Sequence, residues 1–213
     1  MATRLALDDP SLLFEFIRQH SSIHLNSIDV AEVWALAGLA ALARTSPDVT
    51  PSLDLQIGDN QVSRFAFALG LQEVVEGLKP TAAAEPGRTV KLTRFRGWEG
   101  YEALARTIVG LLVPSEALVE ARNTLKYVLV ELFRNVIQHS KDPLGGVVAA
   151  QVMNPGHDSR LVQVVVADAG LGIPEALRWE HPSLHGPEDA LDKGIAWLTA
   201  PPPIGQSTSA NRV

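Results

Sequence analysis

Residues 161–174 read LVQVVVADAGLGIP, and this stretch decides the fold of the C-terminal half of the chain. Its first half is a run of mostly branched apolar side chains, which indicates a strongly apolar β-strand that ends at Asp168. Gly170 and Gly172 follow, and glycine lets the backbone approach a flat ligand closely because it has no Cβ. Pro174 suits the first turn of a helix. Because α/β proteins bind ligands at strand ends, Asp168 is a candidate acceptor for an exocyclic amine.

A second polar motif lies upstream, in ELFRNVIQHS at residues 131–140. We predict a long helix from about 115 to 140, on which Glu131, Asn135 and His139 follow one another at four-residue spacing and share one face. The polar trio flanks an apolar stripe that consists of Leu125, Val128, Leu129, Leu132, Val136 and Ile137. A carboxylate and an amide one turn apart can polarise a water and supply an oxygen ligand to Mg²⁺.

Each motif also has a plain structural interpretation. The trio fits an ordinary polar helix edge, and DAGLGIP fits a strand–turn–helix connection without a ligand. Two other nucleotide-binding motifs fit less well. A dinucleotide fingerprint requires a third glycine, whereas Ile173 and Pro174 follow Gly172, and the Gly-Lys-Ser/Thr of a P-loop does not occur.

Taken together, in this order and at this separation, the two motifs resemble the asparagine box and first glycine box of the GHKL family. This family of Bergerat-fold nucleotide-binding domains includes type II topoisomerases, heat-shock chaperones, histidine kinases, MutL and anti-sigma-factor serine kinases. The resemblance covers about residues 115–213. It implies an α/β sandwich whose sheet supports ATP and Mg²⁺ between the long helix and a lid.

The resemblance also implies roles for individual residues. Asn135 would be the Mg²⁺ ligand, and Glu131 the catalytic acid that orients a water or an acceptor hydroxyl. Asp168 would recognise adenine by accepting a hydrogen bond from its exocyclic amine. Gly170 and Gly172 would shape the adenine pocket, while His139 would lie near the phosphates.

The family pattern continues with a second glycine box, in which a helix N-terminus meets the phosphates. No convincing equivalent occurs before the sequence ends at residues 211–213. We therefore expect the ATP-binding domain to be incomplete within its lid.

The N-terminal half predicts two strand–helix units, which suggest a small α/β domain with a parallel sheet. The predicted strands are 22–27 and 53–57, and the predicted helices are 33–43, with Asp29 as its N-cap, and 62–69. This pattern resembles the STAS domains that partner such kinases in bacterial regulatory switches, which implies docking of a protein partner.

A stretch rich in Pro, Ala and Gly at residues 79–88 is a candidate boundary or surface loop. Beyond it we predict a strand at 90–95, a helix at 98–113, and strands at 146–154 and 161–168. The predicted fold is α/β, with a STAS-like docking domain at 1–96 and a truncated Bergerat-fold sandwich at 97–213.

Composition restricts the classes of function. The chain has 213 residues, a net charge of −6 and no cysteine. The net negative charge argues against a broad nucleic-acid-binding face. The lack of cysteine excludes catalysis by a thiol, and it fits a cytoplasmic location. The apolar run Val33–Ala43 is about half a bilayer span, with Glu32 and Arg44 at its ends, so we expect a buried helix and no membrane anchor.

We therefore expect a cytoplasmic ATP-binding regulatory protein of the GHKL type. It would hydrolyse ATP or transfer the γ-phosphate to a protein partner, and the resemblance also implies a homodimer as one arrangement. The alternative is a non-catalytic interaction or scaffold module that retains the fold. The acidic charge disfavours a third option, a DNA-repair or topoisomerase-like ATPase.

Overall fold

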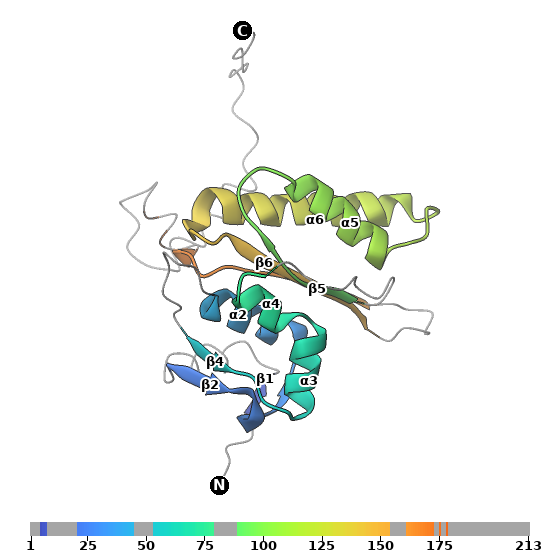
Figure 1. The fold of residues 1–213 in the computed structure, drawn as a ribbon. Helices are drawn as coiled ribbons and strands as arrows, with labels where there is room; N and C mark the ends of the chain where they lie inside the picture. Colours follow the sequence, from blue (N-terminus) through green and yellow to red (C-terminus); the bar gives the residue numbers. More distant parts are fainter. Residues whose placement is uncertain are drawn as a thin grey trace. The chain divides into compact units, whose positions relative to one another are not determined.

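The chain has a mixed α/β structure with small sheets (Figure 1). The structure, a computed structural model, describes residues 5–7, 21–44, 53–78, 89–153 and 161–172, together with 175 and 178. The chain divides into two units, residues 1–170 and 171–213.

The first unit begins with two short parallel strand pairs. Its N-terminal elements are β1 (Leu5–Leu7), β2 (Ser22–His24), the 3₁₀ turn η1 (Leu25–Ser27), β3 (Ile28–Ala31), α2 (Val33–Ala43), β4 (Asp54–Gln56), α3 (Gln61–Ala68) and α4 (Leu71–Val75). β1 pairs with β3, and β2 pairs with β4. The predicted parallel pairing of the two strand–helix units is confirmed for β2 and β4.

Helix α2 is the apolar run of the sequence, and it is a buried helix as predicted. Its buried residues are Val33, Ala35, Leu36, Ala37, Leu39, Ala40, Ala41 and Ala43. The prediction that Asp29 caps this helix is wrong, because Asp29 lies in β3 and the helix begins after Glu32. The Glu32 carboxylate accepts a hydrogen bond from Trp34 Nε1 at 2.8 Å instead of capping the helix.

The second part of this unit is a three-stranded antiparallel sheet in the order β5-β6-β7. Its strands are β5 (Thr89–Phe95), β6 (Gly146–Met153) and β7 (Leu161–Ala167), close to the three predicted strands. The pairing of β5 with β6 draws residues from both sides of position 96 into one sheet. The division into domains at 1–96 and 97–213 stays a prediction.

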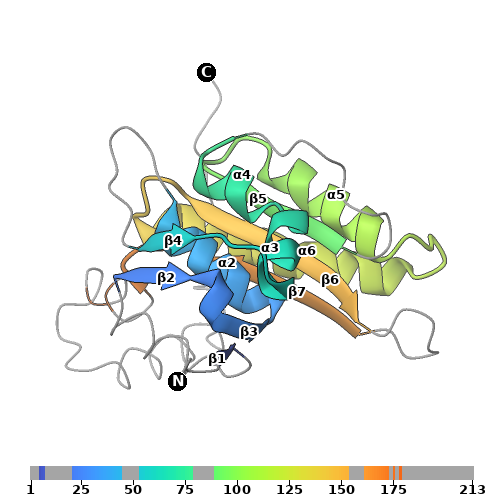
Figure 2. The same ribbon diagram turned by 60° about the horizontal axis from the view of Figure 1, so that its bottom comes forward.

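Helices cover both faces of this sheet. α5 (Tyr101–Leu112) and α6 (Val119–Asn135) pack on one face and α2 packs on the other (Figures 1 and 2). Side chains alternate along a strand. Val148 and Ala150 of β6 therefore join the core under α5 and α6, whereas Val147 and Ala149 join the core around α2. Burial on both faces explains why β6 is apolar at consecutive positions.

The long helix differs from its prediction at both ends. It begins at Val119 because Leu118 has a non-helical backbone, with φ −93° and ψ 51°. After Asn135 the chain continues as a π-helical turn, η2 (Val136–Ser140), which ends where Lys141 takes the left-handed region with φ 55°.

The apolar stripe on α6 is also rotated from the predicted one. Leu129 and Phe133 are fully buried, whereas Val128 and Leu132 are 45% and 38% exposed. The face that the helix turns to the sheet therefore runs through Phe133, and Leu132 lies on its flank with Glu131.

The second unit is described at few positions. Gly172, Glu175 and Arg178 are helical, and Arg178 pairs with Glu175 at 2.6 Å. Across the described part of both units, no helix has the length and apolar content needed to cross a bilayer.

Replacement of Phe133 by alanine should be the most damaging single change on α6. Its ring is fully buried and packs on Phe95, with the ring centroids 4.4 Å apart. We expect Phe133→Ala to lower the free energy of unfolding by about 3–5 kcal/mol in urea denaturation. The neighbouring Leu132→Ala is the matched control and should cost less than about 1 kcal/mol. Equal losses in the two variants would contradict the orientation of the helix.

Candidate functional site

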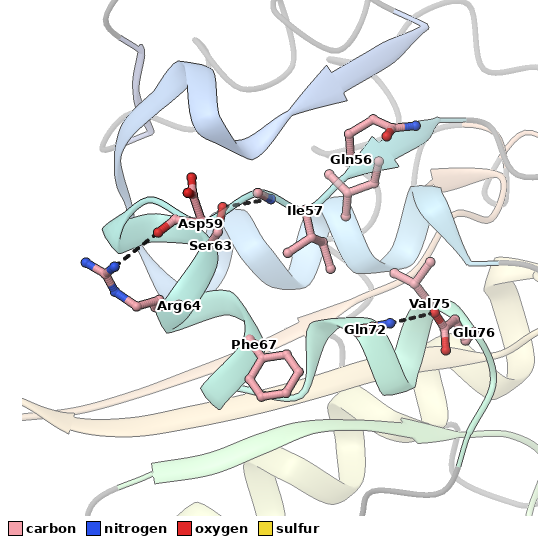
Figure 3. A pocket seen from close by; sticks show the side chains of 11 residues that line it. Gln56, Ile57, Asp59, Ser63, Arg64, Phe67, Gln72, Val75 and Glu76 are labelled. Carbon is pink, nitrogen blue, oxygen red and sulfur yellow. Dashed lines mark hydrogen bonds between the residues drawn. The ribbon is translucent and has the colours of Figure 1, made fainter.

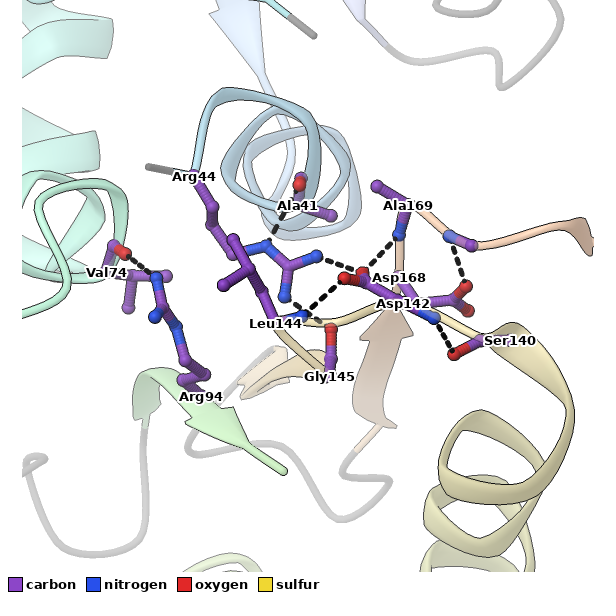
Figure 4. A network of polar contacts seen from close by, with 11 residues as sticks. Ala41, Arg44, Val74, Arg94, Ser140, Asp142, Leu144, Gly145, Asp168 and Ala169 are labelled. Atoms are coloured by element: carbon purple, nitrogen blue, oxygen red, sulfur yellow. Dashed lines mark hydrogen bonds and ion pairs between the residues drawn. The ribbon is translucent and has the colours of Figure 1, made fainter. Parts of the chain in front are cut away.

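The two sequence motifs lie side by side at the end of β7. A Cβ atom built on Gly170 would be only 2.0 Å from the carbonyl oxygen of Ser140. The N–H of Ala169 donates to the Asp142 carboxylate at 2.9 Å (Figure 4). Residues 168–170, named here the 168–170 loop, therefore contact the segment that directly follows the long helix.

Asp168 follows β7 immediately, as predicted, and is half-buried. Its Oδ1 accepts a hydrogen bond from the N–H of Gly170 at 2.9 Å. An aspartate that bonds the backbone two residues ahead forms a tight local turn. This turn fixes the direction in which the carboxylate leaves the strand.

Gly170 closely approaches another part of the chain. The space that a side chain would fill is occupied by the backbone of Ser140. The missing Cβ therefore lets the loop approach the end of η2 closely. Gly172 belongs to the second unit, where it is exposed and has φ 74°, a conformation that favours glycine.

Glu131 and Asn135 occupy the accessible flank of α6. Glu131 accepts from Arg134 at 3.1 Å, in a pair whose side chains are 40% and 43% exposed. Such a solvated pair is weak, so it leaves the carboxylate accessible to a ligand. Asn135 is exposed as the last residue of the helix, and Val128 and Leu132 expose apolar surface on the same flank.

His139 does not continue the row of Glu131 and Asn135. It lies within η2, where a π-helical turn holds more residues than an α-helical one. The wider turn rotates His139 away from the face expected from a four-residue spacing. The side chain is half-buried and already interacts with other groups of the chain.

An ion pair behind the 168–170 loop was missed by the sequence reasoning. Arg44 is 2% exposed, and it pairs with the Asp142 carboxylate (Figure 4). Its guanidinium also donates to the carbonyl of Ala41 at 2.9 Å and to that of Gly145. The sequence does contain a signal for this buried pair, because Arg44 is a single cation at the end of an otherwise apolar helix. Taken alone, however, an arginine in that position indicates only where the helix ends.

A second arginine lies near this pair. Arg94 of β5 donates to the carbonyl of Val74 at 2.9 Å. Burial lowers the pKa of the Arg94 guanidinium, and repulsion from Arg44 adds to this, while Asp142 acts in the opposite direction. Asp142 thus favours the charged form of Arg94.

A groove of about 930 Å³ lies elsewhere in the first unit, between β4 and helices α3 and α4 (Figure 3). Leu55, Ile57, Phe67 and Val75 give it apolar walls, and Arg64, Gln72 and Glu76 are among its polar groups. Phe67 is 60% exposed. None of the residues predicted for the nucleotide site lines this groove.

The donor chemistry of α6 fits Mg²⁺, which prefers carboxylate and amide oxygens and retains several waters. Glu131 and Asn135 provide these oxygens one helical turn apart. Within the described residues, no group of three or more His, Cys, Asp or Glu side chains is placed to hold a metal ion. An ion here would therefore depend on water and substrate oxygens for most of its ligands.

Comparisons with protein-family models, with curated proteins and with solved structures find no match to this chain.

Substitution of Gly170 tests the contact between the two motif segments. Gly170→Ala would drive a Cβ into the Ser140 carbonyl, so we expect a loss of about 1–3 kcal/mol in the free energy of unfolding. Gly110→Ala is the control, because that helical glycine has no atom within 4 Å of the added Cβ. Alanine should stabilise α5 at this position by up to about 1 kcal/mol. A neutral Gly170→Ala would show that the loop does not contact Ser140.

Proposed function

We propose that this chain is an ATP-binding regulatory protein of the GHKL type, built from a STAS-like docking region and a Bergerat-fold ATP-binding domain. It hydrolyses ATP or transfers the γ-phosphate to a protein partner. One observation carries the proposal: the 168–170 loop lies against the end of the helix that bears Glu131 and Asn135. A split nucleotide site requires this neighbourhood, since neither segment suffices alone.

The surroundings of the two segments support the proposal. Asp168 leaves the sheet at a strand end with its orientation fixed by the Gly170 N–H. The flank of α6 combines polar Glu131 and Asn135 with exposed Val128 and Leu132.

In the proposed mechanism Asp168 accepts the exocyclic amine of adenine and selects this base. Asn135 would hold Mg²⁺ through its amide oxygen, and the ion would supply positive charge against the phosphates. Glu131 orients the attacking oxygen of a water or of an acceptor hydroxyl. It needs only a local movement to leave Arg134, because their pair is solvated.

The adenine contact is tested by Asp168→Asn, measured by calorimetry of ATP binding with and without Mg²⁺ on the full-length protein. The asparagine keeps an oxygen for the Gly170 N–H but loses the charge that accepts the amine. Loss of a charged hydrogen bond should weaken binding about 10- to 100-fold. Wild-type affinity in this variant would refute the assignment of Asp168.

The catalytic role is tested by Glu131→Ala, with ATP binding and turnover measured on the same preparation. We expect binding to be retained and turnover to fall by at least about 100-fold, since a positioned acid or base contributes that much. Arg134→Ala is the matched control, because it removes the same ion pair but spares the carboxylate. Turnover lost equally in both variants would indicate that the pair, and not the carboxylate, matters.

A second function is favoured by the groove beside β4. Its apolar walls and exposed Phe67 suit a protein segment, which fits a non-catalytic interaction module. Absence of ATP binding in the calorimetry would favour this module, whereas turnover by the full-length protein would exclude it.

A further inference from the structure

The Asp142 carboxylate is buried, and both of its oxygens accept hydrogen bonds. Its side chain is 4% exposed. Oδ1 accepts from the N–H of Leu144 at 2.8 Å, and Oδ2 accepts both from the N–H of Ala169 at 2.9 Å and from Arg44. A buried carboxylate is tolerated only when it is paired and hydrogen-bonded in this way.

Arg44 is equally constrained on its own side. Its side chain is 1% exposed, and its guanidinium is divided among the carbonyls of Ala41 and Gly145 and the Asp142 carboxylate. The Ala41 carbonyl belongs to the last turn of α2. The cation is thus anchored to a helix that packs on the sheet and holds the carboxylate in one place.

Through Asp142 this anchor reaches the 168–170 loop. Ala169 is exposed, but its N–H donates a hydrogen bond to Asp142. In sequence it lies between Asp168 and Gly170, and Gly170 is in close contact with Ser140. We infer that Arg44 and Asp142 are positioning residues that hold the 168–170 loop in the geometry required for nucleotide binding. This inference rests on the proposed function, in which Asp168 reads the base.

The pair links parts of the sequence about 100 residues apart, since 98 positions separate Arg44 from Asp142. A nucleotide site within residues 97–213 would therefore depend on a side chain from the N-terminal half. Contacts made by α2 would then bear directly on how the base is read.

Three full-chain variants test the inference. Asp142→Asn keeps the shape but has a single oxygen acceptor, so the N–H of Leu144 or of Ala169 must face an amide NH₂ group. Arg44→Met removes the cation at similar length, and the double variant removes both charges. The double variant keeps the test open if Arg44→Met alone, with its uncompensated carboxylate, does not fold.

Two measurements are made on each variant, at a temperature where circular dichroism shows it to be folded. One is the Kd for Mg·ATP by calorimetry, and the other is hydrogen exchange of the Ala169 amide. We expect Asp142→Asn and the double variant to raise the Kd by about tenfold or more and to speed Ala169 exchange. Leu39→Ala, a core lesion in α2, is the control: it should lower the Tm but leave the Kd unchanged.

The outcomes separate the positioning role from a purely structural one. A pair that only stabilises the fold would shift the Tm and leave the Kd of the folded protein unchanged, and this result would overturn the inference. If the wild-type protein does not bind ATP, the proposed function fails. In that case only the hydrogen exchange of the Ala169 amide tests whether Arg44 and Asp142 hold the 168–170 loop. Faster exchange in the variants supports this role, and unchanged exchange refutes it.

Discussion

Burial of the central strand β6 on both faces is the constraint on which the rest of the described structure depends. β6 is the central strand, and its consecutive apolar residues must be covered by helices on both sides. α5 and α6 supply one cover and α2 supplies the other. Because α2 comes from the N-terminal part of the chain, this requirement joins the two halves of the sequence. It also brings the end of α2 to the loop that follows the long helix.

Much of the local structure could be predicted from the sequence, because it is encoded in short-range patterns. The run of branched residues before Asp168 predicts β7, and the alanine- and leucine-rich run after Glu32 predicts α2 as a buried helix. The length and composition of each run predict the type of element in both cases, but only α2 is buried, since the residues of β7 are half-buried or exposed. The order of motifs likewise anticipates that the 168–170 loop and the end of the long helix are neighbours.

What the sequence could not predict depends on contacts between distant residues. Nothing local indicates that Phe133, and not Leu132, faces the sheet, since the two are adjacent apolar residues on one helix. The π-helical turn that displaces His139 is likewise a feature that a regular spacing argument misses. The sequence marks Gly170 as a point of close backbone approach, but it does not indicate which part of the chain lies there. The neighbour that excludes a Cβ is the backbone of Ser140, which only the fold brings there.

The Arg44–Asp142 pair raises the question of why a charge is buried in this place at all. Removing two ions from water costs several kcal/mol for each ion, and their attraction barely offsets this cost. Apolar residues of similar size would stabilise the contact between α2 and the sheet as well or better. They would not, however, accept hydrogen bonds from the N–H groups of Leu144 and Ala169, which would then lose their partner within the chain. What the pair adds is control over the position of the loop backbone. Both oxygens of the carboxylate accept hydrogen bonds, and the guanidinium that binds one of them has a rigid planar geometry. Together they restrict where the loop backbone can lie. Under the proposed function, a loop that presents Asp168 to adenine would need directional control of this kind.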